Sequence, residues 1–283
     1  MIYFNYTADK LPHITLTGKA DIPAPNCHFK RTPHEYIIYF ITSGTMKLTE
    51  GAHTYTLGKG DCILLDPSRT HDGLPTDSDI SYYYVHFLSD FITEIEADSA
   101  YLEKHQIASR IDRFATEQLL VPKMLHFTDV HYSYVESLFE KICFGKEKLY
   151  RKTIDECLLL ELLILCAQNA PTVSVEVPTA GNNLVPRLID YIYENCHHKI
   201  TSTDIEEHFH MNFDYLNRLF KKKTGMTLID FSNRYRILES KKLLKCGLYS
   251  VSEVSWMMGF SNEFYFSRIY KKYEGVAPSY PKQ

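Results

Sequence analysis

Two stretches, TSTDIEEHFHMNFDYLNRLFKKKTG (201–225) and SVSEVSWMMGFSNEFYFSRIYKKYEG (250–275), are copies of one pattern. Residues before the middle of each stretch match at a separation of 49 and residues after it at 50, so the second copy has one extra residue in its turn. Each copy predicts a short helix that starts at a capping box, a tight polar turn, and a longer helix that ends in lysines and glycine. The duplication therefore predicts two helix-turn-helix units.

The longer helix of each unit is expected to divide into an apolar face and a polar face. The apolar side chains predicted to pack inside the domain are Tyr215, Leu216, Leu219 and Phe220 in the first unit and Phe264, Phe266, Ile269 and Tyr270 in the second. Amides and guanidinium groups can read base edges, and ammonium groups can contact phosphates. The candidate DNA-binding residues are Asn212, Asp214, Asn217, Arg218, Lys221, Lys222, Ser261, Asn262, Glu263, Ser267, Arg268, Lys271 and Lys272.

Charge and spacing also favour DNA as the partner. The chain has a net charge of −4, but from Arg218 onward 13 Lys and Arg stand against 5 Asp and Glu. Residues 228–245 contain no Pro or Gly and predict one connecting helix, about 27 Å long at 1.5 Å per residue. Such a spacer could hold two recognition helices near one DNA turn apart, roughly 34 Å. We therefore expect both helices to enter successive major-groove segments on one face of the duplex.

Residues 184–283 resemble the DNA-binding domain of the AraC/XylS family of bacterial transcription regulators. The resemblance rests on YLNRLFKKKTG, on Arg236 of the connecting helix, and on GFSNEFYFSRIYKKYEGVAP, which includes Pro278. It implies sequence-specific binding to promoter or operator DNA, with RNA polymerase as a further candidate partner. The sequence departs from the family pattern at Glu206 and Ser255, where small residues are usual, at His210 in place of the turn glycine, and in the short ending PSYPKQ.

The first hundred residues are predicted to be β-structure. Short runs rich in β-branched and aromatic residues are separated by Gly, Pro, Ser and Asp. The predicted strands are 36–44, 46–50, 53–57, 62–66 and 81–88. Strands of this length and spacing predict an antiparallel cupin-like or jelly-roll barrel.

Two amphipathic helices are predicted after the barrel, at 131–144 and 149–169. Tyr134, Leu138 and Ile142 share one face of the first, and Ile154, Leu158, Leu162 and Leu165 share one face of the second. Within the second helix, the segment CLLLELLILC (157–166) is apolar almost all round, broken only by Glu161, so the second face of this helix is expected to form a homodimer. The alternative is a helix buried within its own domain.

The N-terminal half is similar to the cupin-type sensor domain of the same family, through PHEYIIYFITSGTMKL, GKGDCILLDPSRTH and YYYVHF. This resemblance implies a small-molecule effector, with carbohydrate as the first expectation. The candidate ligand-binding residues are Arg31, His34, Tyr36, Tyr39, His71, Tyr83 and His86.

The main alternative is a cupin-type metal enzyme, a dioxygenase or a sugar isomerase, fused to a DNA-binding module. Metal-binding cupins use HxH with Glu and a further His, whereas here His71 is joined only by His34-Glu35, with no HxH in 28–44. We therefore expect no metal, no cofactor and no enzymatic activity. The seven cysteines never form a CxxC pair, which argues against a repair protein with a zinc centre. A nonspecific architectural DNA binder would leave the acidic N-terminal half without a role.

The expected organisation is a ligand-sensing barrel at 1–100, helical dimerisation region at 101–169, linker at 170–183 and all-α DNA-binding domain at 184–283. No apolar run is long enough to span a membrane, and MIYFNYTADKLPH does not have the pattern of a signal peptide. We expect a cytoplasmic protein.

Overall fold

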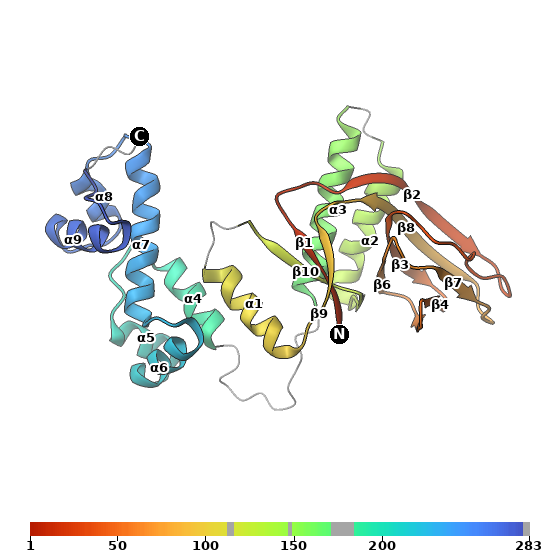
Figure 1. Cartoon of the computed structure of the whole chain (residues 1–283), viewed down its shortest axis with the longest axis horizontal. Helices are drawn as coiled ribbons and strands as arrows, with labels where there is room; N and C mark the ends of the chain where they lie inside the picture. Colours follow the sequence, from red (N-terminus) through yellow and green to blue (C-terminus); the bar gives the residue numbers. More distant parts are fainter. Residues whose placement is uncertain (112–115, 147–148, 171–183, 280–283) are drawn as a thin grey trace. The chain divides into compact units, whose positions relative to one another are not determined.

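The computed structural model describes residues 1–111, 116–146, 149–170 and 184–279 (Figure 1). It divides into two compact units. The first is made of the described residues among 1–104 and 113–174, and the second of those among 105–112 and 175–283. The predicted linker lies outside the described residues except for Ala170.

The first unit contains three antiparallel sheets, ordered β11-β6-β3-β8-β2, β5-β4-β7 and β10-β1-β9. The strands are β1 (Ile2–Thr7), β2 (His13–Ile22), β3 (Tyr36–Ser43), β4 (Met46–Glu50), β5 (His53–Leu57), β6 (Asp61–Leu65), β7 (His71–Leu74), β8 (Ile80–Leu88), β9 (Ile92–Glu96), β10 (Gln118–Pro122) and β11 (Met124–His126). The helices are α2 (Asp129–Phe144) and α3 (Arg151–Gln168), and α1 (Ser99–Ile111) begins in this unit and ends in the second.

Alternation along the central strands builds two cores on opposite faces of the five-stranded sheet. On β3, Tyr39 and its alternate neighbours pack in the barrel interior, a cluster that also contains Leu48 of β4 and Tyr82 of β8. Phe40 points to the other face, where it packs with residues of α2 and α3. Successive side chains of a strand point to opposite faces, so the sheet separates the barrel interior from the helical layer.

The strand predictions are confirmed for β3, β4, β5, β6 and β8, whose bounds differ from the predicted ones by at most one residue. Four strands of the first hundred residues were not predicted: β1, β2, β7 and β9. The β2 strand is at the edge of its sheet, and none of its residues is buried. An edge strand need not show regular apolar alternation, so its sequence, HITLTGKADI, gives a weak strand signal.

The expectation of a purely helical 101–169 region is wrong. Strands β10 and β11 fall inside it, and β10 pairs with β1 (Tyr6 opposite Leu119). This pairing joins segments more than a hundred residues apart, which local sequence patterns do not reveal. The last part of α1 also packs in the core of the second unit, through Ile107.

The predicted helix faces are only partly right. Tyr134 of α2 is 46% exposed, and the buried stripe runs instead through Val135, Leu138, Phe139 and Ile142. On α3, Leu162 is fully buried while Ile154 is 36% exposed. Leu162 therefore belongs to the core of its own domain, not to a surface that a partner could cover.

The second unit contains the two predicted helix-turn-helix units and the helix that joins them. Its helices are α4 (Leu184–Glu194), α5 (Ser202–Phe209), α6 (Phe213–Thr224), α7 (Leu228–Lys245), α8 (Val251–Met257) and α9 (Glu263–Glu274). Phe231 of α7 packs in a core with α4, α5 and α6. Ile237, further along α7, packs in a second core with α8 and α9. The connecting helix thus contributes to both hydrophobic cores, and Figure 1 shows it running past both helix-turn-helix units.

Both capping boxes form as the sequence predicts. Thr201 and Asp204 bond reciprocally at the start of α5, and Ser250 and Glu253 do the same at the start of α8. Each box satisfies backbone N–H groups that have no partner within the helix. Because these helices are only eight and seven residues long, their ends account for much of their hydrogen bonding.

The two turns use the left-handed backbone region with different residues. His210 ends α5 with φ of 53°, and Gly259 occupies the second turn with φ of 63°. A Cβ atom on Gly259 would lie 2.6 Å from the carbonyl oxygen of His197, so only glycine fits there. His210 is exposed and bears only the conformational cost of that backbone region.

Within the described ranges, none of the helices combines the length and apolar character needed to cross a membrane.

Candidate functional site

The second helices of the two units, α6 and α9, each present an exposed basic face. Arg218 and Lys222 are exposed on α6, and Arg268 and Lys271 are exposed on α9. Both helices begin at an asparagine cap and end at a glycine in the left-handed region. The side chains of Leu216 and Phe220, and of Phe266 and Tyr270, are buried behind these faces. The caps and buried stripes therefore fix which basic side chains point to solvent.

Four of the predicted DNA-binding residues are tied to other parts of the fold, and the Arg218 Nε atom donates to the Asp214 carbonyl oxygen on the same helix at 3.2 Å. Asn212 and Asn262 are the helix caps, and their side-chain oxygens accept hydrogen bonds from the backbone N–H groups of Tyr215 (3.3 Å) and Tyr265 (2.7 Å). The Asn217 side-chain oxygen accepts from the backbone N–H of Leu228 at 2.9 Å, which anchors the start of α7. Lys272 pairs with Asp230 of α7 at 3.3 Å.

The remaining predicted residues lie on or beside the exposed faces. Asp214 and Glu263 are acidic residues in the first turns of α6 and α9, where a carboxylate stabilises the helix dipole. The exposed residues are Asp214, Arg218, Lys221, Lys222, Ser261, Glu263, Arg268 and Lys271, and Ser267 is half-buried. The predicted DNA-binding residues of the first unit therefore lie on or beside α6 and those of the second on or beside α9. Some of them are occupied by contacts within the fold.

Two aromatic residues expected in the core lie on the surface instead. Phe264 is 88% exposed and Tyr215 is 43% exposed. The buried stripe of α9 runs through Phe266 and Tyr270, and Phe264 lies two residues, about 200°, away from Phe266 around the helix. Phe264 instead shares a face with Arg268, four residues later. Sequence reasoning missed it because it assumed that aromatic residues lie inside.

The departure from the family pattern at Glu206 has a structural explanation. Its carboxylate accepts a hydrogen bond from the backbone N–H of Phe213 at 2.7 Å and from the Asn212 amide at 3.3 Å. Glu206 therefore supports the first turn of α6. Ser255, the other departure in a leading helix, is fully buried, and its hydroxyl finds no hydrogen-bond partner among the described residues.

A cluster of tyrosines and histidines fills part of the barrel interior in the first unit. The two ring nitrogens of His28 lie 3.0 Å from the Tyr82 hydroxyl and 3.1 Å from the Tyr39 hydroxyl. The Nε2 atoms of His28 and His71 are 3.2 Å apart. Burial lowers the pKa of His28 to about 3 and that of His71 to about 4, and the nearby Arg31 guanidinium adds to both shifts. The cluster is therefore uncharged at neutral pH.

The predicted ligand-binding residues are divided between different surfaces. Tyr39 and His71 belong to the interior cluster, and the backbones of Arg31 and His71 are hydrogen-bonded to each other. His86 bonds Glu35 at 3.2 Å. The remaining three do not join this cluster: Tyr36 and Tyr83 pack on the helical face of the sheet, and His34 is exposed before β3. The alternation that separates the two faces could not be assigned from sequence.

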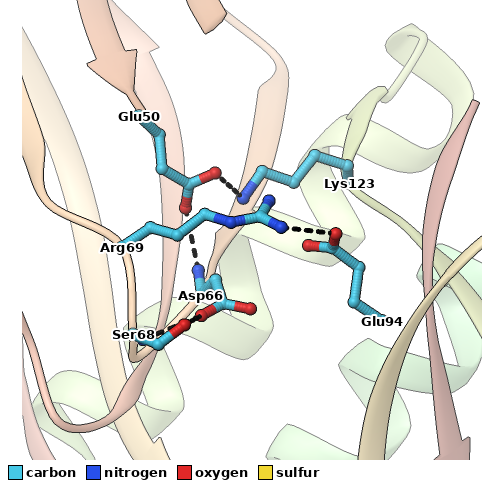
Figure 2. Close-up of polar contacts among 6 residues, drawn as sticks. All are labelled: Glu50, Asp66, Ser68, Arg69, Glu94 and Lys123. Carbon is cyan, nitrogen blue, oxygen red and sulfur yellow. Dashed lines mark hydrogen bonds and ion pairs between the residues drawn. The ribbon is translucent and has the colours of Figure 1, made fainter. Parts of the chain in front are cut away.

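A second polar group, missed by sequence reasoning, links several strands (Figure 2). Lys123, between β10 and β11, forms an ion pair with Glu50 of β4, and these residues are 4% and 1% exposed. The other Glu50 oxygen accepts from the backbone N–H of Asp66 at 2.9 Å, and Arg69 pairs with Glu94 at 2.7 Å. Burial lowers the pKa of Lys123, whereas the Glu50 carboxylate opposes that shift.

The Lys123 side chain also lines a largely apolar recess of about 380 Å³. The recess is formed by Met1, Ile2, His53, Tyr55, Lys123, Met124, Leu125 and His126. None of the predicted ligand-binding residues lies in it. Among the residues that the structure describes, no three His, Cys, Asp or Glu side chains gather in a way that could hold a metal ion.

Comparisons with known proteins match both units. Residues 20–163 match the family model of the AraC-like ligand binding domain, and residues 205–280 match that of a helix-turn-helix domain. The HTH-type transcriptional regulator YisR of Bacillus subtilis is 24% identical over 275 residues, covering 96% of this chain and 94% of YisR. The transcriptional regulatory protein HptR of Staphylococcus aureus is 39% identical over 100 residues, covering 35% of this chain and 39% of HptR.

Among solved structures, an apo ToxT variant from Vibrio cholerae matches 93% of this chain and 95% of its own, with 16% identity and a TM-score of 0.35. The match to the AraC-like ligand-binding family covers half of the chain, and the duplicated helix-turn-helix follows it. The protein therefore belongs to the AraC family of transcriptional regulators, with a ligand-binding domain and a helix-turn-helix DNA-binding domain.

Proposed function

We propose that α6 and α9 read successive major-groove segments of one duplex. The observation that carries this proposal is the duplication of an exposed basic face, with Arg218 and Arg268 at equivalent positions on two capped helices. Arg268 would make a bidentate contact to a guanine edge, and Lys222 would contact a phosphate. Because several predicted residues are engaged in the fold, base reading falls mainly to Arg218, Arg268 and Ser267.

We further propose that Phe264 packs against a thymine methyl group. The Phe264 ring is 88% exposed on a basic helix face, so contact with an apolar group would remove apolar surface from water. Thymine is the one base that offers a methyl group in the major groove. Phe264 lies in the first turn of α9, and the N-terminal residues of a recognition helix are the ones that contact base edges.

Selection of duplexes from a random-sequence library by the full chain tests the reading of DNA. Arg268→Ala should relax discrimination at one position, at a cost of about 1–3 kcal/mol. Lys222→Ala should weaken binding to all sequences similarly and reduce by about one the steepness with which log affinity falls with log salt concentration. Binding that is independent of salt, or no enrichment of any duplex, would contradict the proposal. Replacing each thymine in turn by deoxyuridine removes only the methyl group. At one position this replacement should weaken binding by the wild type, and it should have no effect on binding by Phe264→Ala.

We propose that residues 184–283 form the DNA-binding domain and that the full chain acts as a homodimer through the exposed side of α3. Ile154 is 36% exposed and Leu158 is half-buried on this helix. Ile154→Arg should give a soluble monomer, because a charge in an apolar interface lacks a partner. The exposed Lys152→Gln is the matched control. Light scattering that finds the wild type monomeric at tens of micromolar would contradict the proposal.

We propose that the effector is an uncharged, hydroxyl-rich molecule of the carbohydrate class that binds against the His28–Tyr39–His71 cluster without a metal. The neutral rings of this cluster support that choice, because they can exchange hydrogen bonds with hydroxyl groups. A thermal-shift screen of sugars should find a ligand that raises the melting temperature, and Tyr39→Phe should abolish the shift. Aromatic acids form the second arm of the screen.

The recess beside Lys123 is the second candidate location for the effector, because it offers an open volume of about 380 Å³. In that case Tyr55→Ala, and not Tyr39→Phe, would remove the thermal shift. Near-stoichiometric metal in the purified protein, lost on mutation of His71, would revive the metal enzyme. The proposed role in transcription also implies a cytoplasmic location, no catalytic activity of its own, and RNA polymerase as a partner.

A further inference from the structure

A pocket of about 300 Å³ lies within the second unit, where the turn of the second helix-turn-helix meets α7. It is lined by Lys199, Ile200, Ile229, Ser232, Asn233, Arg236, Gly259, Phe260, Ser261, Asn262 and Tyr265. Two of these residues are cationic and none is acidic. The composition of the lining therefore favours an anion over a cation.

Arg236 provides a buried positive charge at this pocket. Its side chain is 4% exposed, and its Nε atom donates to the carbonyl oxygen of Met258 at 2.7 Å. Its Nη1 atom lies 3.5 Å from the Asn233 side-chain oxygen, and its Nη2 atom finds no acceptor among the described residues. The guanidinium also lies 3.7 Å from the centre of the Phe260 ring. Burial lowers the pKa of Arg236 to about 10, which leaves it protonated at neutral pH.

A buried guanidinium of this kind is usually balanced by a carboxylate, and here no ion pair to Arg236 forms among the described residues. The guanidinium contacts a carbonyl oxygen, an amide oxygen and an aromatic ring, none of which carries a full negative charge. The site therefore holds an excess positive charge beside an open pocket, and the Arg236 Nη2 atom, itself shielded from solvent, has no acceptor among the described residues. This combination points to an anionic ligand.

The start of α9 forms another wall of the same pocket. Asn262 caps the helix, and the backbone N–H groups of the next residues, Glu263 and Phe264, precede the first intrahelical hydrogen bond. The positive end of the helix dipole adds to the field of Arg236 and of the exposed Lys199. The Glu263 carboxylate, which would oppose an anion, is exposed and does not line the pocket.

We propose that this pocket binds one backbone phosphate of duplex DNA, held by Lys199 and the start of α9 with Arg236 behind them. The inference rests on the proposed function, because the pocket adjoins the helix that would read bases through Phe264 and Arg268. A phosphate seated there would fix the depth and angle of α9 in the groove. Phosphate contacts position a recognition helix, whereas base contacts specify the sequence.

The test uses the full chain and a duplex enriched from a random-sequence library. Each phosphate of that duplex is replaced in turn by a neutral methylphosphonate. For the wild type, one position should weaken binding roughly tenfold. In Lys199→Gln the direct contact is already lost, and in Arg236→Gln the buried charge behind it is lost, so neutralising the same phosphate should cost less than about twofold in either variant. Lys245→Gln, an exposed lysine outside the pocket, should behave as the wild type.

Lys199→Gln keeps the test decisive if Arg236→Gln does not fold, since Lys199 is exposed and its removal leaves no buried cavity. If no phosphate position is coupled to either residue, the proposal is wrong. To distinguish a free phosphate ion from a DNA phosphate as the ligand, the melting temperature is compared in potassium phosphate and in potassium chloride at equal ionic strength. Stabilisation by phosphate that Lys199→Gln abolishes, without any coupled position in the duplex, would also overturn the proposal. Failure to enrich any duplex would instead refute the proposed function, and this inference with it.

Discussion

Replacing Lys123 by methionine should destabilise the first unit by about 3–5 kcal/mol, the usual result of removing one partner of a buried ion pair. Lys123 and Glu50 are 4% and 1% exposed, so the remaining carboxylate would be buried without its counter-charge. Methionine matches the length of the lysine stem and retains the contacts with Phe4 and Tyr55, over whose rings the ammonium lies at 5.3 and 5.9 Å. The loss of stability should therefore come from the unpaired Glu50 charge and not from a cavity.

A second substitution separates the charge from the hydrogen bond. Lys123→Met combined with Glu50→Gln removes both charges but keeps an oxygen that can accept from the backbone N–H of Asp66, now 2.9 Å from Glu50. The double variant should regain at least about 2 kcal/mol relative to Lys123→Met alone, because no uncompensated buried charge remains.

Urea unfolding followed by near-ultraviolet circular dichroism measures this difference without adding salt. With a slope of about 1–3 kcal/mol per molar, a loss of 3–5 kcal/mol should lower the midpoint by roughly 2 M. The chain has one tryptophan, Trp256, in the second unit, so its fluorescence transition is an internal control that should not move. A loss below about 1 kcal/mol, or a double variant no more stable than the single one, would refute the reasoning.

Four further substitutions test the burial, backbone conformation or protonation of single residues. Ser255→Ala should stabilise the second unit by about 1 kcal/mol in thermal unfolding, since it removes a buried hydroxyl without a described partner, and destabilisation would show that the hydroxyl is bonded. His210→Gly should raise stability by about 0.5–1 kcal/mol by relieving a left-handed residue, with Gly225→Ala, at φ of 82°, as the opposite change. The pKa of His71 is lowered to about 4 in the fold, whereas a histidine in the unfolded chain has a pKa near 6.5. Between these values the unfolded state binds a proton that the folded state does not. The contribution of His71 to stability is therefore full above pH 6.5 and is lost as the pH falls towards 4. His71→Gln should reduce the slope of unfolding free energy between about pH 4.5 and 6 by up to 1.4 kcal/mol per pH unit, and an unchanged slope would mean that His71 is protonated in the fold.

The helical half of the fold was predictable because its information is local and repeated. The capping boxes, the turn residues and an uninterrupted 228–245 each indicate a boundary within a few residues of where it occurs. The β-half was less predictable, because β1 takes its place only through pairing with β9 and β10. Such long-range pairing leaves no periodic signal in a six-residue strand.

The candidate site shows the same division. The basic positions Arg218 and Arg268 follow from the repeat, whereas the use of Asn217 to anchor α7 depends on a contact eleven residues away. The sequence-based predictions for Phe264, expected in the core, and Tyr36, expected at the ligand site, were wrong for the same reason. Both are aromatic residues whose surroundings depend on which face of an element they occupy, and composition alone does not settle that question.

The length of α7 has a consequence for how this family can tolerate insertions and deletions. At about 100° per residue, one added residue in its middle would turn the second DNA-reading helix by that angle and advance it by 1.5 Å. Seven added residues would nearly restore its heading but advance it by about 10.5 Å, roughly three base pairs. The helix thus sets an angular phase as well as a distance. Because the major groove returns to the same face of the duplex only after a full turn of roughly 34 Å, an advance of three base pairs with the same heading would leave the second helix out of the groove. We therefore expect insertions and deletions within α7 to be rare.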